Sequence, residues 1–153
     1  MEKRLKKVIA GLIMVMAAYS AQAACQITYT TASDVMEKHL AKNGFAARNY
    51  DALCEKLKAA NARMTISASA TVLSGKAISW VMVGVMDRTT TISITGFGAY
   101  STTVNDDPSM STANGTVGDS LTAALEDWNN IDKALASLDL ARNETKSVLM
   151  KKK

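Results

Sequence analysis

The sequence predicts an α+β fold in two layers, with two N-terminal helices, a three-stranded antiparallel meander and one long C-terminal helix. Apolar residues recur with a period near 3.6 before Arg63 and after residue 118, which is typical of amphipathic helices. Between these segments the period is close to 2, which is typical of strands. Short turns separate the strands and favour antiparallel neighbours. Helices beside such a sheet are expected to pack together on one of its faces.

The two N-terminal helices are predicted at residues 31–44 and 45–61. The first ends at Asn43-Gly44, a typical helix end. In the second, one apolar stripe is formed by Tyr50, Leu53, Cys54, Leu57 and Ala60. Cys54 is therefore expected to face the interior.

Three strands are predicted at residues 64–73, 77–86 and 89–104. The middle segment is apolar on both alternations, so it is expected to be the central strand. The polar segment 105–118 is predicted to be a loop. Beyond it, apolar residues in a three-four spacing predict one helix over residues 119–143, which carries Trp128 in its apolar stripe.

The first 23 residues have the layout of a secretory signal peptide. Four basic side chains precede an apolar run of eleven residues, and Ala21 and Ala23 stand where a signal peptidase requires small residues. The apolar run is shorter than the roughly 20 residues that cross a membrane, which disfavours an uncleaved anchor as the alternative. We therefore expect cleavage after Ala23 and a mature chain, residues 24–153, that forms a single α+β domain with a basic tail and no stable membrane anchor. The expected location is periplasmic or secreted.

The chain has two cysteines, Cys25 and Cys54. An even cysteine count in an exported chain is normally oxidised, so a disulfide between them is predicted. Two buried, unpaired thiols are the alternative. Attachment of a lipid to Cys25 is disfavoured because a polar amide, Gln22, lies three residues before it.

The formal charge of +4 is only weak support for nucleic-acid binding, because most of the excess positive charge lies at the two ends of the chain. After removal of residues 1–23 the chain keeps 14 basic and 13 acidic residues, and three of these bases are the terminal lysines 151–153. The body of the chain therefore lacks the basic surface that phosphate contacts require. We expect no nucleic-acid partner.

No catalytic constellation is predicted. His39 is the one histidine in the chain, so a Ser-His-Asp arrangement or a soft-metal ligand set is not expected, and neither is a cofactor. The carboxylates Asp106 and Asp107 belong first to turn chemistry. A hydrolase that uses these two carboxylates and nearby hydroxyls is retained as an alternative.

The predicted sheet is almost free of charge. Between Met64 and Asn105 the charged residues are Lys76, Asp87 and Arg88, all at turns. Soluble proteins usually guard an exposed sheet with charges, because a neutral β surface recruits other chains. If the helices cover the larger side chains, the exposed face carries Val81, Val83, Val85 and Phe97. In the alternative, one helix crosses to that side and the valines are ordinary core residues. We therefore predict an exported envelope protein, of the inhibitor, immunity or secretion-accessory type, that binds a protein partner or a second copy of itself on this face or on a sheet edge.

The alternative function is that of a periplasmic carrier of a small apolar ligand. The ligand would lie in a pocket between the sheet and the C-terminal helix. That pocket would be lined by Trp80, Met82, Met86 and Trp128.

Overall fold

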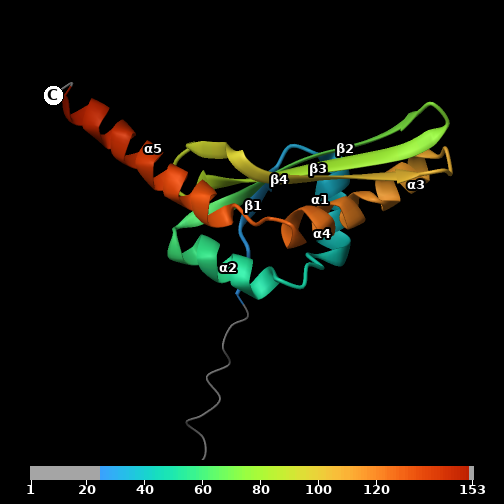
Figure 1. Ribbon diagram of the computed structural model, residues 1–153, viewed down its shortest axis with the longest axis horizontal. Coiled ribbons are helices and arrows are strands. Elements are labelled where there is room, and N and C mark those ends of the chain that lie inside the picture. The colour runs from blue at the N-terminus through green and yellow to red at the C-terminus, as the bar shows by residue number, and fades with distance from the viewer. Residues whose placement is uncertain (1–24, 152–153) are drawn as a thin grey trace, which may run out of the picture.

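Four strands and five helices make up residues 25–151, the part of the chain that the computed structural model describes (Figure 1). The strands are β1 (Tyr29–Thr31), β2 (Ala62–Leu73), β3 (Lys76–Asp87) and β4 (Ser93–Asn105). The helices are α1 (Asp34–Asn43), α2 (Tyr50–Ala59), α3 (Met110–Gly115), α4 (Val117–Glu126) and α5 (Ile131–Lys151). The predicted α+β fold is confirmed. The predicted signal peptide lies outside the described residues.

The sheet has the strand order β1-β2-β3-β4. Its long strands β2, β3 and β4 form the predicted antiparallel meander. The turn between β2 and β3 places Ser74 and Gly75 at positive φ, 51° and 74°, as a two-residue hairpin turn requires. The strand β1 is an addition to the prediction, because its three residues are too few to show a period. It pairs in parallel with Met64–Ile66, so the sheet is mixed rather than purely antiparallel.

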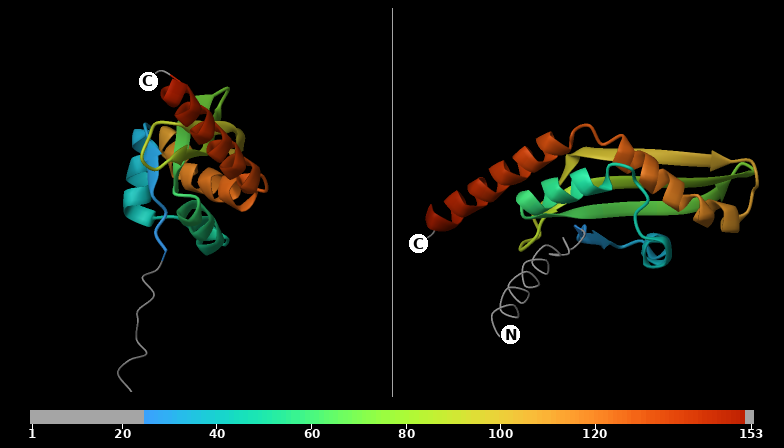
Figure 2. Two further views of the ribbon diagram at one scale, coloured as in Figure 1. Left: turned by 90° about the vertical axis from the view of Figure 1, so that its left-hand side faces the viewer. Right: turned by 90° about the horizontal axis from the view of Figure 1, so that it is seen from below.

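The helices cover one face of the sheet (Figures 1 and 2). That inner face presents Val81, Val83 and Val85 of β3, all fully buried, to α4 and α5. Beyond the core, α5 continues past the end of the sheet (Figure 1). The two layers are therefore the helices and the sheet. The face of the sheet that points away from the helices is uncovered.

The prediction of which face is covered is wrong. The alternation of β3 occurs as expected, but the helices cover the valines, and the larger residues Trp80 and Met82 lie on the opposite face. The helix α4 brings its own large side chains, Leu121 and Leu125, into the interface, so the strand needs to supply only medium-sized ones. The size of a strand side chain therefore did not indicate its burial.

The long C-terminal helix predicted over residues 119–143 is divided in two. The helix α4 ends at Glu126, and α5 begins at Ile131. Between them Trp128 turns inward and its indole Nε1 donates a hydrogen bond to the carbonyl oxygen of Phe97, at 2.9 Å. Asn129 and Asn130 follow, and asparagine favours turns over helix interiors. The apolar spacing continues across the break, so periodicity alone could not locate it.

The segment 105–118, predicted to be a loop, also contains a helix. Ser109 caps α3 by accepting a hydrogen bond from the backbone N–H of Thr112, at 3.0 Å. Thr116 then separates α3 from α4, whose first residue is Val117. The polar residues that indicated a loop instead form this cap and the exposed side of a short helix.

The predicted disulfide between Cys25 and Cys54 is present, with 5.9 Å between the two Cα atoms. It ties the segment before β1 to α2, where Cys54 is buried as its place in the apolar stripe predicted. A hydrogen bond of 3.0 Å from the Ile27 backbone N–H to the Tyr50 hydroxyl supports the same junction.

Candidate functional site

The uncovered surface of the sheet is the candidate site, and we call it the open face. Its side chains alternate along the three long strands with those that the helices cover. It consists of Thr65, Ser67, Ser69 and Thr71 of β2, Ile78, Trp80, Met82 and Met86 of β3, and Tyr100, Thr102 and Val104 of β4.

The register of the strands arranges the open face in rows. Ser67, Met82 and Tyr100 form one row, and Ser69, Trp80 and Thr102 form the next. Tyr100 is 81% exposed and Trp80 is 40% exposed. Aromatic and methionine side chains are enriched at protein interfaces, and their clustering on one exposed surface marks a candidate interaction site.

Charged side chains lie at the two ends of the open face. Arg63 stands where β2 begins, and Arg88 follows β3 at the same end and donates a hydrogen bond to the hydroxyl of Thr28, at 2.8 Å. At the other end Lys76 forms an ion pair with Asp106, and Asp107 follows. A neutral centre with charged ends is the usual anatomy of a protein interface.

The residues predicted for partner binding do not lie together on this surface. Val81, Val83 and Val85 belong to the buried core, so the prediction that they are exposed is wrong. Phe97 is 39% exposed and lies next to the irregular pairing of β3 with β4 near Gly84. The alternation of the strand marked an uncharged face correctly, but it did not show which of the two faces is open.

The pocket predicted for an apolar ligand is not formed. Trp80, Met82 and Met86 point to the open face, whereas Trp128 is buried with the helices on the inner face. The sheet itself separates the two groups of side chains. The four residues therefore do not line a common cavity.

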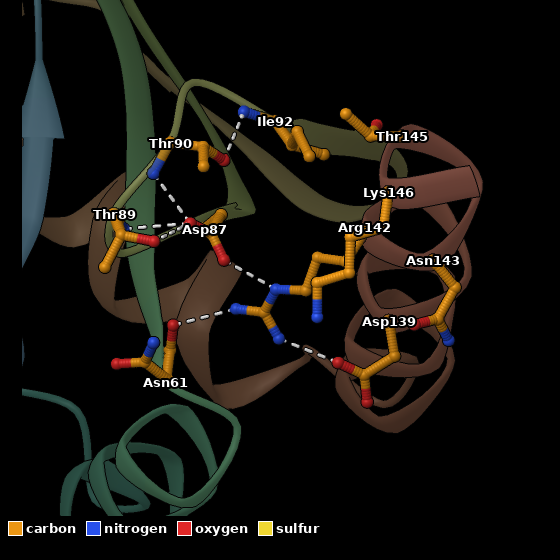
Figure 3. Close-up of a pocket in the computed structure, with 10 residues that line it drawn as sticks. All are labelled: Asn61, Asp87, Thr89, Thr90, Ile92, Asp139, Arg142, Asn143, Thr145 and Lys146. Carbon is orange, nitrogen blue, oxygen red and sulfur yellow. Dashed lines mark hydrogen bonds and ion pairs between the residues drawn. The ribbon is translucent and has the colours of Figure 1, made fainter. Parts of the chain in front are cut away.

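A second polar site, which the sequence reasoning missed, surrounds Arg142 of α5 (Figure 3). The Arg142 Nε donates to Asp87 Oδ2 at 2.5 Å, and its two Nη atoms donate to the carbonyl oxygens of Ala60 and Asn61 at 2.9 and 2.8 Å. Nη1 also reaches Asp139 at 2.7 Å. One side chain thus joins α5 to the end of β3 and to the junction of α2 with β2.

The carboxylate of Asp87 is held on both oxygens. Its Oδ1 accepts hydrogen bonds from the Thr89 backbone N–H and hydroxyl, both at 2.8 Å, and from the Thr90 backbone N–H at 2.6 Å. Burial opposes ionisation, but the hydrogen bonds from Thr89, Arg142 and Thr90 hold the pKa of Asp87 well below its usual range. The cleft beside this cluster has a volume of about 590 Å³. Because the donors of Arg142 are engaged, we assign the cluster a structural role.

A further ion pair, between Arg48 and Glu126, lies within the helical layer. Arg48 Nε and Nη2 donate to the two carboxylate oxygens of Glu126 at 2.9 and 2.7 Å, and the Arg48 backbone N–H donates to the same carboxylate at 3.1 Å. These hydrogen bonds lower the pKa of Glu126 to about 2. The segment before α2 is thereby joined to the end of α4.

We expect stability to fall as the pH drops below about 4.5. Asp87 and Glu126 have lower pKa values in the folded chain than their ordinary values of 3.8 and 4.5, so the unfolded chain takes up protons first. Their stabilisation is complete above these ordinary values and is lost as the pH falls toward 2 and below. Urea unfolding between pH 6 and pH 2 measures the effect. Asp87→Asn and Glu126→Gln should each make the pH dependence shallower, and equal slopes in all three proteins would contradict it.

The carboxylates of the alternative hydrolase are engaged in local structure. Asp106 pairs with Lys76, and Asp107 Oδ2 accepts hydrogen bonds from the hydroxyls of Ser109 and Thr112 at 3.3 and 2.5 Å. These contacts fix the turn that leads from β4 into α3. The arrangement is that of a helix cap.

Four hydroxyls meet in the interior between β3, β4 and α4. Ser79 Oγ lies 2.9 Å from Ser120 Oγ and 3.0 Å from Thr116 Oγ1, and Ser120 Oγ lies 2.8 Å from Thr103 Oγ1. An activated serine needs a base within hydrogen-bond reach. Within residues 25–151 the partners of both serines are hydroxyl and carbonyl oxygens. The cluster therefore satisfies buried polar groups and fixes the position of α4 on the sheet.

His39 packs against α4 through a glycine. A Cβ atom at Gly118 would lie 2.1 Å from His39 Cε1, so the missing side chain allows α1 to approach α4 closely. The ring Nδ1 lies 3.2 Å from Asn43 Nδ2. His39 is thus a packing residue between two helices.

Within residues 25–151 no group of three or more His, Cys, Asp or Glu side chains comes together as a metal site, and none of the helices combines the length with the apolar character of a membrane span. Comparison with protein families, curated proteins and solved structures finds no match to this chain. Fold and site together define a disulfide-linked two-layer α+β protein with one open, uncharged sheet face.

Proposed function

We propose that this protein is an exported binding protein, without an enzymatic activity of its own, that docks another protein chain on the open face. The observation that carries the proposal is the exposure of Trp80, Tyr100 and Val104 on a neutral sheet surface, while the helices cover the opposite surface. Burial of such side chains away from water favours association, and the net gain is what remains after the cost of ordering the two chains.

The proposed location outside the cytoplasm is supported by the cysteines. Cys25 and Cys54 are joined, and protein disulfides persist in oxidising compartments. The predicted signal peptide agrees with this location. An inhibitor, an immunity protein or a secretion accessory would each use a docking surface of this kind.

We expect a photoreactive amino acid at Tyr100 to form a cross-link to a protein chain inside the producing cell. The matched control carries the same amino acid at Leu140, which is 64% exposed on α5, away from the open face. Mass spectrometry of the cross-linked product identifies the chain. Equal yields from positions 100 and 140 would contradict the proposed function.

A further inference from the structure

We propose that the chain docked on the open face is a second copy of this protein, so that two sheets pack face to face in a two-fold dimer. This inference rests on the proposed function, because it names the occupant of the same surface. A two-fold interface brings the same surface of both subunits together, so the surface must complement itself. The neutral centre of the open face and the charges at its ends allow it to complement itself. Its area is sufficient for a dimer.

The centre of the open face is neutral. The strand residues 64–73, 77–86 and 93–105 carry no charged side chain, and Arg63, Lys76 and Asp87 lie at the ends of the strands. A charged side chain near a two-fold axis meets its own copy, and such a pair of like charges opposes association. The helical layer is charged, since α2 carries Glu55, Lys56 and Lys58. The open face is thus suited to meet itself.

The area of the open face is sufficient for a stable dimer. The strands β2, β3 and β4 have 12, 12 and 13 residues. At about 3.3 Å per residue and about 4.8 Å between strands, the face measures roughly 40 by 14 Å. Two such faces bury about 1,100 Å², which exceeds the ~1,000 Å² expected of a biological interface.

The charges at the ends favour one orientation of the two copies. Arg63 and Arg88 make one end basic, whereas Asp106 and Asp107 outnumber Lys76 at the other end. A two-fold axis across the strands places the basic end of one copy over the acidic end of the other. An axis along the strands would place the basic end over the basic end of the other copy, and the acidic end over the acidic end, so like charges would meet. We therefore infer that the strands of the two sheets run in opposite directions, with the axis near the middle of the face.

The dimer is tested by sedimentation equilibrium over a range of concentrations. The wild-type chain should be dimeric, and Tyr100→Lys should weaken the dimer about 100-fold, because it places a charge in the apolar centre. Tyr100 is highly exposed in a single chain, so the variant should fold, which circular dichroism checks. Leu140→Lys, the control on α5, should remain dimeric.

Tryptophan quenching supplies an independent readout. In a single chain Trp80 is exposed and Trp128 is buried, so iodide should quench one tryptophan of the monomeric variant. In the dimer Trp80 is covered, and quenching should be nearly absent. A wild-type chain that is monomeric at all concentrations, with Trp80 quenched, would overturn the dimer. The proposed function would still stand if Tyr100 cross-links to a different protein. A dimer that Tyr100→Lys leaves intact uses another surface and also overturns the inference.

The orientation is tested with two single-cysteine variants of β2. Ser69 lies near the proposed axis, and Leu73 lies on the same side of the same strand, four residues away. The middle of β2 lies between Ser67 and Ala68, so Leu73 is about 18 Å from the axis and its two copies are about 36 Å apart in the opposed orientation. A short bismaleimide should therefore link Ser69→Cys subunits and leave Leu73→Cys subunits unlinked. Equal linking of both variants would overturn the opposed orientation.

Discussion

Replacement of Arg142 by alanine is expected to lower the free energy of unfolding by about 3 kcal/mol. The side chain joins three parts of the fold through hydrogen bonds to Asp87, to two backbone carbonyls and to Asp139. Its removal leaves the Asp87 carboxylate, which is 3% exposed, without its charged partner. A buried charge that loses its partner costs several kcal/mol, because it gave up hydration on folding. Urea unfolding at pH 7 measures the loss.

The matched control is Arg48→Ala. Arg48 also forms a two-point contact with a carboxylate, but its side chain is 88% exposed. Exposed ion pairs contribute less than about 1 kcal/mol. Arg142→Ala combined with Asp87→Asn should cost less than the two single changes added together, since the second change removes the unpaired charge. If Arg142→Ala destabilises the protein no more than Arg48→Ala, the clamp assigned to Arg142 is incorrect.

The sequence predicted the elements of the sheet better than its open surface. The alternation in β3 separates Val81, Val83 and Val85 from Trp80 and Met82, and the structure keeps this separation. Periodicity states which residues share a face, but it does not state which face a helix will cover. In this fold α4 supplies the bulk of the interface, so the valines are buried and the tryptophan is left exposed. The uncharged character was predictable because both faces of β3 lack charge.

Two features escaped prediction because they depend on contacts distant in sequence. The break before α5 follows from the hydrogen bond of Trp128 to the carbonyl of Phe97, 31 residues away. The site around Arg142 joins residues 55 positions apart along the chain. A signal for the second was present, since Arg142 follows Ile131, Leu135 and Leu138 on one helical stripe, where an apolar residue would be expected. A charge on an apolar stripe indicates a buried partner.

Loss of the disulfide is expected to lower the free energy of unfolding by about 3–4 kcal/mol, the value for closing a loop of roughly 30 residues on the chain-entropy model. The bond joins Cys25 to Cys54 across 29 positions of sequence. The variant Cys25→Ser/Cys54→Ser removes both sulfurs and leaves no free thiol to react. Urea unfolding should give the same midpoint for this variant and for the wild-type chain under reducing conditions.

The effect should be local before it becomes global. The strand β1 has three residues and pairs with β2 alone, so the bond four positions before it limits how far this segment can separate from the sheet. Hydrogen exchange should therefore lose protection first in β1 and at the Ile27 amide, which bonds to Tyr50, while β3 stays protected. Uniform loss of protection across the sheet would contradict this order. Protein isolated from its producing cell with both thiols free would contradict the proposed location, because an oxidising compartment joins cysteines held at this distance.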